Sequence, residues 1–184
     1  YFIIFIIGSL LYWTQYDSKG PLDIAKEHIA ENELDKALIV LKNGIQDTPN
    51  ISELRFLLGK LYFDNFQYEN AIKELERAIK YEHSKAEIFP MLAFAYKKTE
   101  TDLALINLAV DKANLLPEQI VEIKLHQVQA YLRLNKESQA KEIINEIKQS
   151  DIKSSFASLA LVYEALIAKN NHSAKFQLAK ILKN

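Results

Sequence analysis

Four histidines are the side chains of this sequence best suited to acid–base chemistry or metal binding near neutral pH. They are His28, His83, His126 and His172. A helical zinc site needs two histidines about one turn apart, and no two of these are that close. Cysteine is absent, which excludes disulfides, thiolate metal sites and a cysteine nucleophile. We therefore expect no metal site.

Catalysis by other groups is not indicated either. Acidic residues alternate with lysines along stretches of helical periodicity, which is the pattern of solvated helix faces. The sequence contains no phosphate-binding loop, dinucleotide fingerprint or nucleophile elbow. We therefore expect a protein that is not an enzyme, has no catalytic residues and binds no cofactor or small-molecule substrate.

The composition indicates a folded, helical protein without affinity for polyanions. Apolar residues make up 49% and charged residues 26% of the 184 residues, which is ordinary for a globular chain. Glycine and proline occur only four times each, which favours helices joined by short connections. The net charge is −1 and the pI is about 6.5, so no basic field is present to bind nucleic acid.

The first residues form a segment of their own. The stretch from Tyr1 to Trp13 is uncharged and almost wholly apolar. A membrane-spanning helix needs about 20 apolar residues and a signal-peptide core about 7 to 15. Residues 1–17 are therefore interpreted as a membrane anchor or signal segment that lacks its N-terminal flank. No small-residue cleavage motif follows, which favours an anchor; a signal peptide and a buried core helix are the alternatives.

The remainder of the chain is repetitive. A shift of 34 residues places small residues on small residues, and an aromatic or histidine position recurs with them. The small residues are Ala25, Gly59 and Ala93, then Ala37 and Ala71, Gly44 and Ala78, and Ala140 and Ala174. The aromatic position holds His28, Tyr62, Tyr96 and, after one step of 35, Tyr131. The extra residue of that step is expected in the turn near residues 97–102.

Each repeat unit consists of two apolar-periodic runs. In residues 67–80, for example, Tyr68, Ala71 and Leu75 share one helical stripe, and Glu–Lys pairs occupy the opposite face. Strand patterns are absent, so we expect ten helices paired by turns of two to four residues. Their predicted ranges are 22–31, 34–47, 52–65, 67–80, 86–98, 102–115, 119–134, 137–148, 154–168 and 171–183.

A helix–turn–helix unit of this length and pattern resembles the tetratricopeptide repeat (TPR). The second unit shows the resemblance most fully, at Leu58, Gly59, Tyr62, Tyr68, Ala71 and Ala78. The resemblance implies an all-α, right-handed solenoid of about five helical hairpins, preceded by the apolar N-terminal helix. The TPR domain would span residues 18–184, in units 18–51, 52–85, 86–120, 121–154 and 155–184.

The first three units are also similar to the beginning of the TPR proteins of bacterial PEP-CTERM and exopolysaccharide systems. Residues 25–63 and 71–96 carry this likeness, including the element Pro90-Met91-Leu92-Ala93 early in a first helix. This resemblance implies a bacterial envelope protein.

In TPR terms, the recurring small residues mark the closest helix contacts. The expected helix-packing residues are Ala25, Gly59, Ala93, Ala37, Ala71, Ala78, Ala140 and Ala174. A glycine inside a helix costs about 1 kcal/mol relative to alanine, so Gly59 needs a compensating contact. We expect Gly59 to let two helices touch, with Ala71 as its counterpart on the partner helix.

The resemblance also implies a concave groove lined mainly by the first helix of each unit. The predicted groove residues are Lys26, Phe56, Lys60, Phe63, Phe94, Lys97, Gln129, Arg133 and Tyr163, together with Ile29, Lys98, Leu125 and Leu159. This mixture of apolar side chains and scattered positive charge suits an extended peptide or a helix with some acidic character. Alternatively, several of these residues pack against a neighbouring helix or the chain's own terminus.

Three functions agree with these features. The first is a non-catalytic, membrane-anchored scaffold, with an extracytoplasmic TPR domain that binds a partner protein or peptide in an envelope complex. By the finer resemblance, that complex would serve exopolysaccharide or protein sorting. The second is a chaperone-like module in envelope biogenesis, such as cytochrome c maturation or secretion. The third is a structural accessory subunit of a membrane enzyme.

Overall fold

The computed structural model describes residues 19–150 and 155–168, and all of its regular structure there is helical. The first two units comprise α2 (Pro21–Ala30) with α3 (Leu34–Asp47), and α4 (Ser52–Asp64) with α5 (Tyr68–Lys80). The third comprises α6 (Lys85–Lys98), the short α7 (Asp102–Ile106) and the 3₁₀ turn η1 (Val110–Lys112). Then follow α8 (Pro117–Arg133), α9 (Glu137–Gln149) and α10 (Ser155–Ile167).

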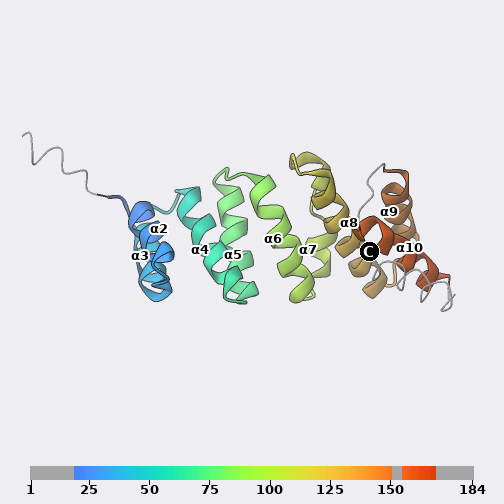
Figure 1. Cartoon of the computed structure of the whole chain (residues 1–184), viewed down its shortest axis with the longest axis horizontal. Helices are drawn as coiled ribbons and strands as arrows, with labels where there is room; N and C mark the ends of the chain where they lie inside the picture. The colour runs from blue at the N-terminus through green and yellow to red at the C-terminus, as the bar shows by residue number, and fades with distance from the viewer. Residues whose placement is uncertain (1–18, 151–154, 169–184) are drawn as a thin grey trace, which may run out of the picture.

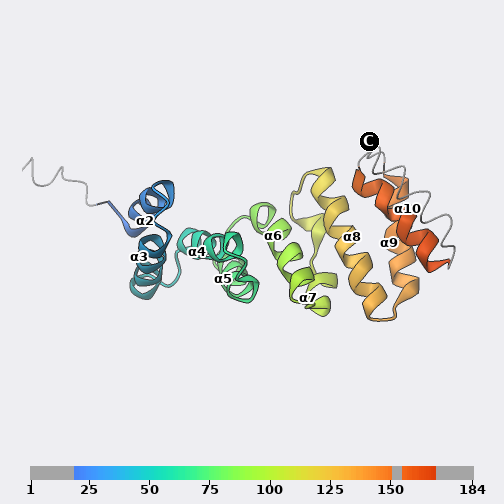
Figure 2. The same ribbon diagram turned by 60° about the horizontal axis from the view of Figure 1, so that its bottom comes forward.

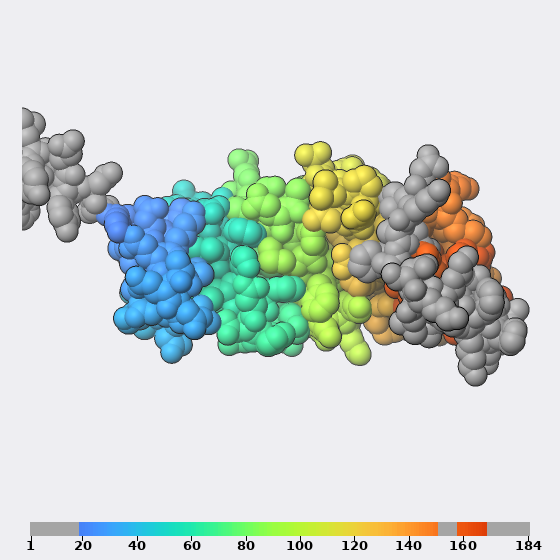
Figure 3. Space-filling view, viewed as in Figure 1, coloured from blue at the N-terminus to red at the C-terminus, as the bar shows by residue number. Residues whose placement is uncertain are grey.

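The helices are arranged in one row in chain order. Figures 1 and 2 show α2 and α3 at one end of the long axis and α9 and α10 at the other. Each helix packs on its hairpin partner, and first helices also contact the neighbouring unit, as α6 contacts both α5 and α8. The space-filling view shows the units as successive bands in the same order (Figure 3). The expected all-α succession of helical hairpins is therefore present in the described residues.

Within the range described, no helix combines the length and apolar composition that a membrane span requires. The predicted anchor, Tyr1–Trp13, the helix expected at residues 171–183 and the packing residue Ala174 all lie outside that range.

The turns inside four units share one geometry. Each turn has three residues, and its middle residue has a positive φ between 54° and 60°. These middle residues are Asn32, Phe66, Glu100 and Asn135. In every case the next residue donates its backbone N–H to the carbonyl of the aromatic or histidine position, at 2.8–2.9 Å. This is a Schellman cap, which satisfies the last carbonyl groups of the first helix.

The identical turns correct the predicted place of the extra residue. The turn at residues 99–101 has the same length as the other three, so the insertion cannot lie there. Instead, α8 begins fourteen residues before Tyr131, whereas α6 begins eleven residues before Tyr96. The first helix of the fourth unit is longer by about one turn, and the second helix of the third unit is correspondingly interrupted.

The helix predicted over residues 102–115 is wrong beyond Ile106. The chain leaves the α-helix at Asn107 and forms only η1 before α8 begins. A buried side chain compensates for the early end, because the Gln127 amide donates to the carbonyl oxygens of Leu105 at 3.1 Å and Leu108 at 3.2 Å. Gln127 takes the place that Leu58 and Leu92 hold in the preceding units, at a similar depth of burial.

The core follows the row of helices in three main apolar clusters. Seven of the eight expected helix-packing residues are described, and all are buried. The glycine contact differs from the expectation. An added Cβ at Gly59 would have Leu75 as its nearest neighbour, 2.8 Å from Cγ, rather than Ala71.

One buried ion network joins the two helices of the second unit. Arg55 on α4 donates to Glu74 on α5 at 2.8 Å, and its Nε donates to the carbonyl of Pro49 at 2.8 Å. The second carboxylate oxygen of Glu74 accepts from Arg77 at 2.9 Å. Because both Glu74 oxygens have guanidinium partners, the buried charge is compensated.

Candidate functional site

Aromatic rings from three successive units form a continuous cluster. Phe63 at the end of α4 lies 5.7 Å from both Tyr68 of α5 and Phe94 of α6, measured between ring centroids. Tyr68 and Phe94 are 5.9 Å apart, and Phe94 lies 6.5 Å from the imidazole of His126 on α8. All four contacts are edge-to-face, the geometry that the ring quadrupoles favour. We call Phe63, Tyr68, Phe94 and His126 the aromatic cluster.

Phe66 extends this cluster toward solvent. Its ring lies 6.4 Å from that of Tyr68, and the residue is 78% exposed. It occupies the positive-φ position of its turn, with φ of 60°. A bulky residue is uncommon in this left-handed conformation. Because the phenyl ring is mostly exposed, its burial contributes little to stability.

Two ammonium groups flank the cluster. The Nζ atoms of Lys97 and Lys98 lie 5.9 and 5.3 Å from the centroid of Phe94, within cation–π range. Burial, and then the positive charge of Lys98, lowers the pKa of Lys97. Neither lysine forms an ion pair with a carboxylate of the described residues. The cluster therefore has a positive edge, which the nearby Glu122 offsets only in part at Lys97.

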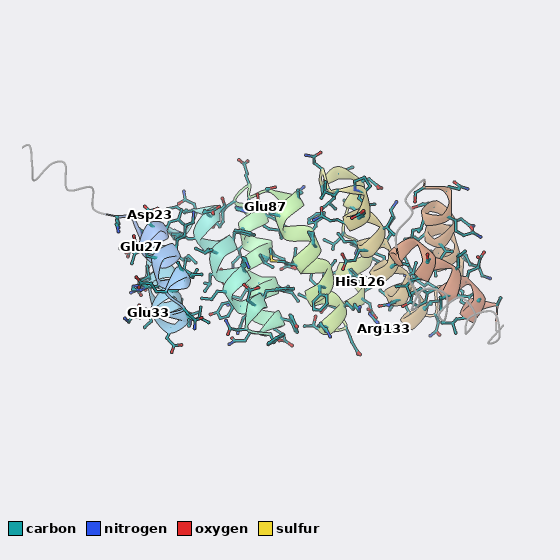
Figure 4. All side chains as sticks on the ribbon, viewed as in Figure 1. Asp23, Glu27, Glu33, Glu87, His126 and Arg133 are labelled. Atoms are coloured by element: carbon teal, nitrogen blue, oxygen red, sulfur yellow. The ribbon has the colours of Figure 1, made fainter. Side chains whose placement is uncertain are left out.

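His126 forms the polar end of the cluster. Figure 4 places it midway along α8, and the residue is 8% exposed. Neither Nδ1 nor Nε2 has a hydrogen-bond partner, and the Glu122 carboxylate is 4.0 Å from Nε2. Burial, and then the charge of Lys97, lowers the pKa of His126 to about 4. The imidazole is therefore neutral at pH 7, with an unused donor and an unused acceptor.

The other predicted groove residues have partners within the chain. Phe56 stacks on His83 with ring centroids 4.2 Å apart. The amide of Gln129 donates to the hydroxyl of Tyr163, which joins α8 to α10. Gln129 therefore packs against a neighbouring helix, as the alternative interpretation expects, whereas Phe56 packs against the turn that follows α5.

The predicted cations outside the cluster are ion-paired. Arg133 donates from Nε to both oxygens of Asp102, at 2.9 and 3.0 Å, and this hydrogen bonding raises the pKa of the guanidinium. Lys60 pairs with Asp64 at 2.7 Å, and Lys26 lies 3.7 Å from Glu53. Of the predicted groove residues, the structure thus gathers Phe63, Phe94, Lys97 and Lys98 in one place.

Sequence reasoning missed two members of the cluster. The sequence pattern places Tyr68 on the same helical stripe as Ala71 and Leu75, but the residue opens α5 and contacts the rings of the neighbouring first helices. No sequence signal singled out His126, because the run 120–132 also contains Glu122, Lys124, Gln127 and Gln129.

One further group has the composition of a metal site. Ligand atoms of His28, Glu31 and Glu33 lie within 4.8 Å of one another. However, Glu33 accepts hydrogen bonds from His28 at 2.8 Å and from Lys36 at 2.6 Å. Both hydrogen bonds lower the pKa of Glu33, and the one from Lys36 has the larger effect. Both carboxylate oxygens of Glu33 are therefore already used by a surface ion pair.

Comparison with known proteins shows the fold. YrrB, a TPR protein with an unusual peptide-binding site, superposes with a TM-score of 0.68 at 18% identity, over 96% of this chain and 90% of its own. Two structures of MamA superpose with TM-scores of 0.70 and 0.68, both at 20% identity, over 89% and 88% of this chain and 88% and 94% of their own. No family model matches the sequence.

In sequence, the chain is similar to lipopolysaccharide assembly protein B of Escherichia coli strain K12, and equally to that protein in two other strains of the species. The identity is 26% over 77 residues. This match covers 41% of the chain but only about a fifth of the relative's length. The structural likenesses to YrrB and MamA confirm the predicted TPR fold.

Proposed function

From a TPR fold with one exposed aromatic and cationic site, we propose that this chain is a non-catalytic scaffold that binds an extended peptide segment of a partner protein. The observation that carries the proposal is the aromatic cluster, which crosses α4, α5, α6 and α8. Aromatic side chains provide the largest contact area per residue in interfaces, and a row of rings offers several anchor points.

The character of the peptide follows from the surroundings of the cluster. Phe63 and Phe94 are half-buried, so each ring is held in place and still offers surface to a ligand. Lys97 and Lys98 supply positive charge, which the nearby Glu122 offsets only in part at Lys97, and this favours an acidic partner. A known peptide-binding site in YrrB, which has the same fold, supports this kind of ligand.

The test is selection of short random peptides on the full chain, followed by affinity measurement with single-site variants. Phe63→Ala and Phe94→Ala should each weaken binding of the selected peptides at least tenfold, while the helical circular dichroism signal stays unchanged. Phe56→Ala is the matched control, because that ring stacks on His83 away from the cluster. Equal losses in all three variants, or none, would contradict the assignment of the site.

The likeness to lipopolysaccharide assembly protein B favours a place in the bacterial envelope. We propose that Tyr1–Trp13 anchors the chain to a membrane, with the TPR domain extracytoplasmic and its partner in a complex for surface polysaccharide or protein sorting. Expression with and without residues 1–17, followed by membrane fractionation and protease protection, tests both parts. Recovery of the intact chain in the soluble fraction would overturn the anchor.

The same experiments separate the alternative functions. A chaperone-like module for envelope biogenesis would select apolar peptides with little sequence preference, whereas a scaffold would select one motif. A structural accessory subunit would lose assembly only when Tyr1–Trp13 is changed, and the Phe63→Ala and Phe94→Ala variants would still assemble normally.

A further inference from the structure

We propose that His126, together with Lys97 and Lys98, forms a carboxylate-binding subsite at the α8 end of the aromatic cluster, and that peptide binding there is coupled to protonation of His126. This inference rests on the proposed peptide-binding function and adds the position and chemistry of its acidic anchor.

His126 has unused hydrogen-bonding capacity. Buried polar side chains in folded proteins nearly always have partners, and exceptions call for an explanation. Both ring nitrogens lack one, although the residue is more than nine-tenths buried. The ring also contacts Phe94, so it belongs to the cluster rather than to the apolar core behind it. A ligand group that bonds to the imidazole would supply the missing partner.

The charge around His126 also favours a bound carboxylate. The charged groups that act on the ring are Lys97 from α6 and Glu122 from its own helix, 4.0 Å away. Lys98 adds a second cation 5.3 Å from the centroid of Phe94, and Arg133 on α8 is neutralised by Asp102. An incoming carboxylate would offset Lys97, and it would accept a charge-assisted hydrogen bond from a protonated imidazole.

The subsite also requires a small rearrangement. Neither nitrogen of His126 is accessible, so the exposed tenth of its side chain is carbon. A half-turn of the ring about the Cβ–Cγ bond exchanges nitrogen and carbon positions. Lys97, a long and flexible side chain, can move toward the ligand at the same time. The subsite is thus closed without ligand and forms on binding.

Proton coupling follows from the two states of the ring. Without ligand, burial and Lys97 hold the pKa of His126 near 4. A bound carboxylate favours the charged form and raises that pKa toward its ordinary value of 6.5. Between these two values, binding takes up a proton, so affinity rises as the pH falls, by up to about tenfold per pH unit.

The experiment uses the full chain with labelled histidine rings and two synthetic peptides, acetyl-Phe-Ala-Ala-Glu-amide and its Gln counterpart, followed by NMR. The Glu peptide should shift the His126 ring signals, raise the His126 titration midpoint and bind about tenfold more tightly near pH 5.5 than near pH 7.5. The Gln peptide should do none of these. A third peptide, the Gln form with a free C-terminal carboxylate, distinguishes a chain terminus from an acidic side chain.

Four variants complete the test. His126→Gln should remove the pH dependence of Glu-peptide binding, and Lys97→Gln should weaken binding at both pH values. His83→Gln is the matched control, since His83 lies between Glu53 and Glu87 outside the subsite. The affinity of this variant for the Glu peptide should depend on pH as it does in the unmodified chain. Glu122→Gln should leave the effect in place. If Glu122→Gln abolishes it, Glu122 is the partner of the protonated ring and the subsite is wrong.

Two further results would overturn the inference in different ways. Equal binding of the Glu and Gln peptides would exclude the carboxylate subsite while leaving peptide binding by the aromatic cluster intact. Unchanged His126 signals with either peptide would exclude a ligand role for His126. The proposed function itself fails only if the Phe63→Ala and Phe94→Ala variants keep the affinity for the library-selected peptides.

Discussion

Replacing Gly59 with alanine should destabilise this protein, although the same change stabilises an ordinary helix. Alanine is preferred over glycine inside a helix by about 0.5–1 kcal/mol. At Gly59, however, the added Cβ would lie 2.8 Å from Cγ, 2.9 Å from Cδ2 and 3.1 Å from the backbone nitrogen of Leu75. The overlap involves the branch point and the backbone of Leu75, so rotation of its terminal methyl groups cannot relieve it.

The expected magnitude follows from where Leu75 can move. The side chain is fully buried, so α5 as a whole must shift away from α4. Overpacking of this kind costs about 1–3 kcal/mol, and the gain in helix propensity offsets part of it. We expect a net loss of about 1–2 kcal/mol in the free energy of unfolding. For a domain of this size, that corresponds to a decrease in Tm of roughly 2–8 °C.

Thermal and urea denaturation followed by circular dichroism measure this effect. Lys73→Ala is the control, because Lys73 is an exposed residue on the same helix, α5, and its replacement should be nearly neutral. A Leu75→Ala background removes Cγ and Cδ2 and leaves only the 3.1 Å contact with the backbone nitrogen, so Gly59→Ala should then be close to neutral. A Gly59→Ala protein that melts at or above the unmodified protein would refute the close-contact role of this glycine.

Three further predictions concern stability. Glu74→Ala should cost about 3–5 kcal/mol in urea denaturation because it leaves Arg55 buried without its carboxylate; a loss below about 1 kcal/mol would contradict this. Phe66→Asn should raise Tm slightly, since asparagine tolerates φ of 60° better than phenylalanine; a lower Tm would mean that the ring contact with Tyr68 outweighs the backbone strain. The pKa of His126 is about 4 in the folded protein against an ordinary 6.5, so the unfolded chain binds more protons between these values. The free energy of unfolding should therefore fall as the pH decreases from about 6.5 to 4, by at most about 3 kcal/mol, and His126→Gln should show less of this decrease.

The repeat register was predictable because it depends on side-chain size at fixed intervals. Tyr62, Tyr96 and Tyr131 recur with the small residues, and the structure gives all three the same role, as acceptors in the helix-ending turn. The contacts at these positions are local, because the residues that form each hairpin contact one another within a single unit. Periodicity alone therefore indicated nearly all helices and their pairing.

The interruption of α7 was not predictable in the same way. Residues 102–115 keep an apolar period, and nothing within them breaks a helix as proline would. The helix ends early because Gln127, on the following helix, can satisfy the carbonyl groups that are left free. The only visible sign was a glutamine at a position that holds leucine in the preceding units, and it lay outside the segment that it affects.

The candidate site was predicted in part for a similar reason. Phe63, Phe94 and Lys97 occupy positions that TPR geometry directs to one face, so the register was sufficient to select them. Phe56 fits the same rule but stacks on His83, a contact between a helix and a turn that the register does not specify. Pairing of this kind depends on the actual path of the chain between the units.

Gln127 has a consequence for the cooperativity of unfolding. In a linear array, stability is the sum of the intrinsic terms of each repeat and the coupling between neighbours. At the boundary between the third and fourth units, part of that coupling is two polar hydrogen bonds instead of the leucine packing found at the earlier boundaries. The array would then unfold as two cooperative units that meet at this boundary. Hydrogen exchange should detect them, with α8 and α9 opening separately from α2 to α6. The boundary lies beside Phe94 and His126, so a ligand that bridges α6 and α8 would join the two units and make them unfold as one.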